Sequence, residues 1–282
     1  MTTNLVKGIY AAALTPMHED LRCDTSELAA HCLDLLQRGC SGVVLFGTSG
    51  EGSSFAVDER LEALREVIAH GVPENKIIVA NGSANIVETI RLVEGSLKQQ
   101  VSTFLIAPPI VYSSPPDEGV IQFYRTVINS VGSKKLQLLL YHIPQLTRIP
   151  ITHTIIETLL AEFPEVIVGL KESEGNLDYL QSILKAFPSL KVYVGAERQI
   201  VEGMQLGASG SICGLANCYP ELVVSLLTAR ENPQMLIDIC EAKKGLHFIP
   251  TLKAILEQTR GKAWHILRPP LISQKFVANF SI

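Results

Sequence analysis

Short apolar runs alternate with longer amphipathic stretches along nearly the whole chain, and this alternation predicts the secondary structure. Apolar runs of about four to eight residues, bounded by glycine, proline or polar residues, are typical of strands buried on both faces. Stretches with apolar residues three and four apart are typical of helices that bury one side. The sequence predicts these strand–helix pairs: Ile9–Leu14 with Thr25–Gln37, Gly42–Phe46 with Val57–Ala69, Ile77–Ala80 with Val87–Lys98, Phe104–Ala107 with Gly119–Ser130, Leu136–Tyr141 with Thr152–Ala161, Val166–Leu170 with Leu177–Ala186, Lys191–Val194 with Gln199–Leu206, and Gly210–Cys213 with Pro220–Ala229.

Eight such pairs in succession, without a long break in composition, favour an α/β fold in which a parallel sheet closes into a TIM (β/α)8 barrel. An open, doubly wound sheet would usually carry a Gly-rich nucleotide-binding turn after its first strand. Here the first strand runs into Thr15-Pro16-Met17, which is no such turn. Helical periodicity continues over Met235–Lys244 and Thr251–Gln258. We therefore expect a barrel over 1–230 and a C-terminal helical extension over 231–282 that packs on it.

Composition narrows the class of protein. The 282 residues are 47% hydrophobic and 18% charged, which suits one large domain. A net charge of −4 without a long basic run argues against nucleic acid as a partner. The first residues lack the apolar core of a signal peptide, and no apolar run is long enough to span a bilayer. No Cys-x-x-Cys pair occurs, so we expect reduced thiols in a cytoplasmic protein, with neither a zinc site nor a disulfide framework, for the six cysteines Cys23, Cys32, Cys40, Cys213, Cys218 and Cys240.

A lysine stands where the sixth predicted strand ends. The carboxyl ends of the strands in a (β/α)8 barrel meet at one mouth, where the chemistry of such enzymes takes place. Val166–Leu170 runs directly into Lys171. An ammonium group at that mouth loses hydration, which favours the neutral amine, and a neutral amine can attack a ketone to form an imine. The alternative is that Lys171 begins a polar loop and extends its charge into water.

Other polar groups follow neighbouring strands. Gly47–Gly52 reads Gly-Thr-Ser-Gly-Glu-Gly, in which the glycines let backbone N–H groups point at an anion. Together with the hydroxyls of Thr48 and Ser49, this turn would hold a small carboxylate, although ordinary strand–helix turns are also rich in glycine. Tyr141 ends the fifth strand, where a phenol beside an amine can pass a proton. A packed core tyrosine with a hydrogen-bonded hydroxyl fits that position as well.

Further candidates lie after the seventh and eighth strands. Gly195 and Glu197 follow the seventh strand, and the segment Gly207–Gly214 contains no lysine or arginine, which argues against a phosphate site there. Because side chains alternate along a strand, His142 should face the helices if Tyr141 faces the barrel interior. The remaining histidines show no metal-ligand spacing with carboxylates, and no Gly-x-Ser-x-Gly elbow supports a serine hydrolase.

The ordered set of motifs resembles the dihydrodipicolinate synthase / N-acetylneuraminate lyase superfamily of class I aldolases, over essentially the whole chain. The motifs are Ala13-x-Thr15-Pro16, Gly47-Thr48-Ser49-Gly50-Glu51, Tyr141-x-x-Pro144, Gly169-x-Lys171-Glu172 and Arg268-Pro269-Pro270-Leu271. The resemblance implies that Lys171 forms a Schiff base with pyruvate and that Tyr141 shuttles protons. It also implies that Thr48 and Ser49 bind the pyruvate carboxylate.

The resemblance has further implications for the site and the assembly. Thr48 would share a hydroxyl relay with a tyrosine from a neighbouring subunit, which by position resembles Tyr112. The backbone carbonyl of Ile212 would face the lysine. No metal or organic cofactor is implied beyond the covalent imine. The family is typically a homotetramer, built as a dimer of tight dimers.

Departures from the synthase branch bear on the second substrate. Synthases usually have Tyr-Asn-x-Pro followed two residues later by an arginine that binds the second carboxylate. Here His142 and Leu146 occupy those places, with Arg148 two residues further on, and Val111 stands where synthases usually have a second tyrosine. These differences argue against a role in lysine biosynthesis.

The positions that contact hydroxylated substrates in the lyases hold Ser173 and Glu197, and both side chains can bond a substrate hydroxyl. The sequence therefore favours an aldolase that cleaves a 2-oxo-3-deoxy sugar acid, or a related 4-hydroxy-2-oxo acid, to pyruvate and an aldehyde. One alternative is a dihydrodipicolinate synthase with an altered aldehyde site. Another is a barrel that binds an oxo acid without turnover, although a pure binder requires neither an amine nor a phenol.

Overall fold

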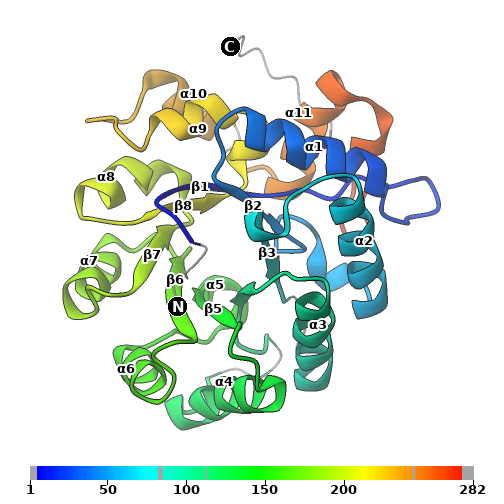
Figure 1. Cartoon of the computed structure of the whole chain (residues 1–282). Coiled ribbons are helices and arrows are strands. Elements are labelled where there is room, and N and C mark those ends of the chain that lie inside the picture. The colour runs from blue at the N-terminus through cyan, green and yellow to red at the C-terminus, as the bar shows by residue number, and fades with distance from the viewer. Residues whose placement is uncertain (1–4, 82–84, 111, 113, 243–244, 275–282) are drawn as a thin grey trace.

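The computed structural model describes residues 5–81, 85–110, 112, 114–242 and 245–274. Parallel strands pair in the order of the sequence, and pairing of the last strand with the first closes the barrel seen in Figure 1. The predicted fold class is therefore confirmed. The strands are β1 (Gly8–Ala12), β2 (Gly42–Leu45), β3 (Ile77–Ala80), β4 (Thr103–Ile106), β5 (Gln137–His142), β6 (Ile167–Glu172), β7 (Lys191–Val194) and β8 (Gly210–Cys213).

Helices surround the barrel and connect its strands (Figure 1). Across the described residues they are α1 (Thr25–Gln37), α2 (Val57–Ala69), α3 (Ile86–Lys98), α4 (Asp117–Val131), α5 (Pro144–Thr147), α6 (His153–Glu162), α7 (Leu177–Ala186), α8 (Ile200–Gln205), α9 (Pro220–Ser225), α10 (Gln234–Ala242) and α11 (Phe248–Arg260). Shorter 3-10 turns are η1 (Gly52–Ser54), η2 (Glu74–Lys76), η3 (Glu197–Gln199), η4 (Leu215–Asn217) and η5 (Lys262–Trp264). No helix among the described residues has both the length and the apolar character needed to cross a bilayer.

The apolar core has two layers, and strand alternation assigns side chains to them. Along β5, Leu138 and Leu140 belong to the layer between strands and helices, whereas Leu139 and Tyr141 belong to the cluster inside the barrel. Tyr193 of β7 lies in the same inner cluster. Because alternation is strict, the residue after each inward side chain points to the helices. This rule places Tyr141, and not its neighbour, at the barrel axis.

A strand extends beyond its predicted end where polar residues continue it. β6 was predicted to end at Leu170, yet it includes Lys171 and Glu172. These two residues pair in register with Tyr141 and His142 of β5. Backbone pairing does not depend on side-chain polarity, so an apolar run alone ends such a strand too early.

Other boundaries were also wrong by a few residues. β1 ends at Ala12 rather than Leu14, and α9 ends at Ser225 rather than Ala229. The short helix α5, which begins at Pro144, was not predicted; proline is favoured in the first turn because it has no N–H to leave unpaired. Residue 244, the predicted end of α10, lies outside the described residues.

The C-terminal helices pack against connections of the barrel. α11 contacts η4, which follows β8, and α10 contacts η3, which follows β7. The indole Nε1 of Trp264, a fully buried residue, donates a hydrogen bond to Oε1 of Glu27 in α1 at 2.9 Å. The division at residue 230 between barrel and extension stays a prediction.

Candidate active site

A lysine and a tyrosine face each other across two adjacent strands inside the barrel. Lys171 of β6 pairs in register with Tyr141 of β5, so both side chains point to the interior at the carboxyl ends of their strands. Nζ of Lys171 donates a hydrogen bond to the Tyr141 hydroxyl at 3.3 Å and lies 4.6 Å from its ring centroid. The two residues are 7% and 5% exposed. The amine is therefore held inside the protein beside a phenol, rather than extended into water.

This pair lies in the wall of a cavity of about 440 Å³. The cavity brings together nearly all of the residues that the sequence singled out. These are Thr48, Ser49, Tyr141, Lys171, Ser173, Gly195, Glu197 and Ile212. They come from the ends of different strands, which meet at one mouth because the sheet is closed and parallel.

The turn after β2 is held in its shape by close backbone contacts. A Cβ atom at Gly50 would stand 2.7 Å from the carbonyl oxygen of Ala13, and one at Gly52 would stand 1.7 Å from that of Phe46. The hydroxyl of Thr15 donates to the carbonyl oxygen of Gly50 at 2.7 Å. The early Ala-x-Thr-Pro motif therefore supports the turn that carries Thr48 and Ser49.

A buried ion pair between this turn and helix α11 also holds the turn in place. The sequence did not predict this pair. Nζ of Lys253 in α11 lies 2.6 Å from Oε1 of Glu51, and both side chains are almost fully buried. Glu51 Oε2 accepts the backbone N–H of Arg268 at 3.0 Å, and Nζ of Lys253 also donates to the carbonyl oxygen of Ile266 at 2.7 Å. Burial lowers the pKa of Lys253, and the Glu51 carboxylate opposes that shift. The only sign of the pair in the sequence is Lys253, a charged residue within an apolar helical stretch.

The loop between β6 and α7 brings Ser173 to the cavity. A Cβ atom at Gly195 would stand 1.9 Å from Oγ of Ser173 and 2.8 Å from the carbonyl oxygen of Glu172. Gly195 therefore leaves the space that the Ser173 hydroxyl occupies. After β7, Oε1 of Glu197 accepts the backbone N–H of Leu215 at 3.2 Å, which leaves its other carboxylate oxygen for further bonds.

One predicted site residue, Tyr112, lies apart from this cavity. Tyr112, in the connection between β4 and α4, is 67% exposed and does not line the cavity of its own chain. Val111, beside it, lies outside the described residues. Leu146, which stands in the place of the synthase arginine, does line the cavity, whereas Arg148 lies exposed outside it.

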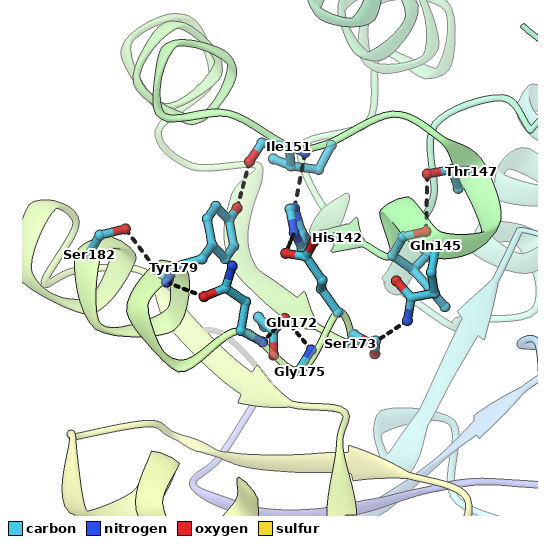
Figure 2. A network of polar contacts seen from close by, with 12 residues as sticks. His142, Gln145, Thr147, Ile151, Glu172, Ser173, Gly175, Tyr179 and Ser182 are labelled. Carbon is cyan, nitrogen blue, oxygen red and sulfur yellow. Dashed lines mark hydrogen bonds and ion pairs between the residues drawn. The ribbon is translucent and has the colours of Figure 1, made fainter. Parts of the chain in front are cut away.

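His142 faces the helices, as the alternation along β5 predicts. Its ring stacks on Tyr179 of α7, with centroids 4.0 Å apart and an interplanar angle of 17°. Figure 2 shows His142 above Glu172, in a polar network on the outer side of the strands. The sequence anticipated this orientation but not the carboxylates around it.

One cysteine, Cys213 at the end of β8, lines the cavity. Burial raises the pKa of its thiol to about 11. The nucleophilic thiolate is therefore rare at neutral pH, and Lys171 is the better candidate for covalent chemistry.

Comparison with known proteins gives the family. The model of the dihydrodipicolinate synthetase family matches residues 5–274. The chain belongs to this family. An uncharacterised DapA-like lyase from Chloroflexus aurantiacus is 31% identical over 277 residues, which cover 94% of this chain and 91% of that protein. The 4-hydroxy-tetrahydrodipicolinate synthase of Ralstonia nicotianae is 31% identical over 79% of this chain and 74% of its own length.

Solved structures of other proteins share the fold. Dihydrodipicolinate synthase from Agrobacterium tumefaciens superposes with a TM-score of 0.90 at 28% identity, covering 95% of this chain and 94% of that one. A variant of the 2-keto-3-deoxygluconate aldolase of Sulfolobus solfataricus superposes with a TM-score of 0.83 at 21% identity, covering 95% and 91%. Family membership confirms the resemblance and the enzyme class that the sequence predicts, a lyase of the aldolase type.

Proposed function

We propose that this protein is a Schiff-base-forming, pyruvate-dependent aldolase. It cleaves a 2-oxo-3-deoxy sugar acid, or a related 4-hydroxy-2-oxo acid, to pyruvate and an aldehyde. The observation that carries the proposal is the contact of Lys171 Nζ with the Tyr141 hydroxyl at 3.3 Å inside the cavity. A prophage protein of the dihydrodipicolinic acid synthase family from Escherichia coli K12 was solved in complex with pyruvate, which supports pyruvate as the shared ligand.

The proposed cycle uses the protonated imine of Lys171 as an electron sink. Neutral Lys171 attacks C2 of the oxo acid. The Tyr141 hydroxyl gives its proton to the departing water, which leaves a protonated imine and the Tyr141 phenolate. Tyr141 takes the proton of the C4 hydroxyl while the C3–C4 electron pair moves to the imine nitrogen, so an aldehyde departs and an enamine remains. Protonation of the enamine at C3 and hydrolysis by water then release pyruvate and the free lysine. No metal or organic cofactor takes part in these steps.

The cavity supplies contacts for the oxo-acid half. The hydroxyls and backbone N–H groups of Thr48 and Ser49 bind the carboxylate next to C2. The backbone carbonyl of Ile212 faces Lys171 from β8 and accepts a hydrogen bond from the amine or the imine. These roles rest on the resemblance and on the presence of all three residues in the wall of the cavity.

The other half of the substrate is neutral and hydroxylated. Ser173 and Glu197 contact its hydroxyl groups, and Gly195 leaves room for them. No arginine lines the described part of the cavity, where Leu146 takes the synthase arginine's place. A second carboxylate would therefore lack its bidentate partner, which disfavours aspartate semialdehyde as a substrate.

The assembly completes the site. Because Tyr112 is exposed and does not line its own cavity, we assign its hydroxyl to the relay of Thr48 in a neighbouring subunit. This contact requires at least a dimer, and the full assembly is a homotetramer of two tight dimers. The described cysteines are thiols rather than disulfides, which suits a cytoplasmic enzyme, where thiols stay reduced.

Covalent trapping tests the proposal. Borohydride with pyruvate should inactivate the protein irreversibly, and peptide mass spectrometry should locate the reduced adduct on Lys171. The Lys171→Ala variant should show neither effect, while Lys191→Ala, which changes a lysine at the opposite end of the barrel, should be labelled like the wild type. Labelling of Lys171→Ala as strong as that of the wild type would refute the assignment.

A substrate panel separates the alternatives. Pyruvate release from 2-oxo-3-deoxy acids is the expected result. Robust condensation of pyruvate with aspartate semialdehyde would instead favour a synthase, and pyruvate binding without any turnover would favour a non-catalytic oxo-acid binder.

A further inference from the structure

A second polar cluster lies behind the site, on the helix side of β5 and β6. It consists of His142, Glu172 and Glu174, and one potential ligand atom from each lies within 4.8 Å of the others. His142 and Glu172 are buried, whereas the Glu174 side chain is 39% exposed. The cluster adjoins the strand residues that carry Tyr141 and Lys171, yet the proposed cycle uses none of it.

The hydrogen bonds of His142 fix its tautomer. The backbone N–H of Ile151 donates to Nδ1 of His142 at 3.1 Å, a contact drawn in Figure 2, so Nδ1 carries a lone pair. In the neutral ring the other nitrogen, Nε2, then carries the hydrogen, and it donates to Oε2 of Glu174 at 3.2 Å. Nε2 therefore has no lone pair to offer a metal ion, although the spacing of the three side chains would suit one. The cluster is better understood as a set of directed hydrogen bonds.

Glu172 holds the loop that follows β6. Its side chain is fully buried, and its Oε1 accepts the backbone N–H groups of Gly175 at 2.9 Å and Asn176 at 3.4 Å. Its Oε2 has no hydrogen-bond partner among the described residues. Burial raises the pKa of Glu172, and the backbone donors oppose that shift. The Glu172 carboxylate therefore fixes the far end of the loop through Oε1 alone.

The near end of the loop is held by other bonds. The backbone N–H of Ser173 donates to the carbonyl oxygen of His142 at 2.9 Å, and Nε2 of Gln145 donates to the carbonyl oxygen of Ser173 at 2.5 Å. At the far end, Nε2 of Gln199 also donates to the carbonyl oxygen of Gly175 at 2.6 Å. Between these points Glu174 is tied by its side chain to His142. Every residue from 173 to 175 therefore has a partner outside the loop.

We propose that His142 and Glu174 are positioning residues that fix the Ser173 hydroxyl in the cavity and so set the preference for oxo acids with hydroxyl groups beyond C4. The inference rests on the proposed aldolase function. A hydroxyl that is ordered before binding costs less entropy to use than one on a free loop. The bond from His142 to Glu174 lies one residue from Ser173 and acts through that residue's backbone.

Glu174 offers the cleaner test because it lies at the surface. Glu174→Ala removes the acceptor of the His142 bond, Glu174→Gln keeps a carbonyl acceptor, and Glu157→Ala changes an exposed glutamate on α6. For a 2-oxo-3-deoxyhexonate, Glu174→Ala should lower kcat/KM about three- to tenfold, the loss expected for one hydrogen bond, through a higher KM. For 4-hydroxy-2-oxopentanoate, which has no hydroxyl beyond C4, the value should not change. Glu174→Gln and Glu157→Ala should leave the ratio of the two substrates at its wild-type value.

A double variant tests whether Glu174 acts on substrate preference through Ser173. Ser173→Ala should lower the same ratio, and Glu174→Ala combined with Ser173→Ala should lower it no further, because both changes remove one interaction. Additive losses, or equal losses on both substrates, would overturn the proposal. A ratio that responds to zinc or to EDTA would also overturn it in favour of a metal site.

Trapping with pyruvate and borohydride distinguishes failure of this inference from failure of the function. If all variants are labelled at Lys171 but the ratio stays constant, the positioning role is wrong and the aldolase stands. If the wild type itself is not labelled, the proposed function fails and the inference falls with it.

Discussion

At the residue scale, the Tyr141 hydroxyl is the group on which bond cleavage depends in the proposed cycle. Tyr141→Phe removes the oxygen that lies 3.3 Å from Lys171 Nζ and leaves the ring beside the amine. General acid–base groups typically contribute about 10²- to 10⁴-fold to rate, so we expect kcat for cleavage to fall about 100-fold or more. Pyruvate should still be trapped on Lys171, although more slowly, and coupled pyruvate release measures the fall.

Tyr124 supplies the matched control for that substitution. Its buried hydroxyl donates to the carbonyl oxygen of Ile106 at 2.9 Å, in the layer between strands and helices. Tyr124→Phe loses a buried hydroxyl without touching the cavity, so kcat should stay close to the wild-type value while stability falls. If Tyr141→Phe cleaves substrate at the wild-type rate, the phenol has no part in the cycle.

At the element scale, the turn after β2 depends on helix α11 through the Glu51–Lys253 pair. Glu51→Gln leaves a buried ammonium without its counter-charge, and Lys253→Met leaves a buried carboxylate. Each single change should lower the free energy of unfolding by about 3–5 kcal/mol, and the double variant should lose less than the sum. Urea unfolding measures these values. We also expect a higher KM for the oxo acid in the single variants, because the turn carries Thr48 and Ser49.

An exposed ion pair provides the comparison. Nη2 of Arg65 lies 2.5 Å from Oε1 of Glu62, and both side chains are about 60% exposed. Water screens such an exposed pair, so Glu62→Gln should change the free energy of unfolding little. Strictly additive losses for Glu51 and Lys253 would show that the two buried groups do not stabilise each other.

The secondary-structure elements also explain which features could be predicted from the sequence and which could not. The barrel was predictable because each strand and helix repeats its own apolar period, and Lys171 and Tyr141 followed because strand ends meet at one mouth. The Glu51–Lys253 pair was not predictable, since only the folded chain brings α11 under the turn. For the same reason the sequence predicted where His142 points but not that Glu174 receives its hydrogen bond.

At the scale of the whole molecule, a buried histidine supports the junction between the first and last strands of the barrel. His31 of α1 is fully buried, and its Nε2 donates to Oδ1 of Asn217 at 2.9 Å. Asn217 in turn donates to the carbonyl oxygens of Ala12 and Gly214, so it joins the end of β1 to the turn after β8. Because both of its N–H bonds go to carbonyls, its oxygen must accept, and His31 is bound as the neutral Nε2–H form.

This arrangement predicts an acid-sensitive fold. Burial lowers the pKa of His31 to about 4, while an unfolded histidine titrates near 6.5. Between these values the unfolded chain binds more protons, so stability is complete above pH 6.5 and falls as the pH drops toward 4. The shift corresponds to a loss of about 3 kcal/mol at the acid end. Urea unfolding at several pH values measures this slope.

Substitution of His31 measures how much this residue contributes to the pH dependence of the free energy of unfolding. His142, whose pKa burial also lowers, contributes in the same direction, so some acid sensitivity remains in any single variant. His31→Gln keeps an N–H donor for Asn217 but cannot titrate, and it should therefore flatten the curve between pH 6.5 and 4. His18→Gln, which changes an exposed histidine, should leave the wild-type slope intact. If His31→Gln loses stability with acid as steeply as the wild type, the junction between β1 and β8 does not control the response of the barrel to pH.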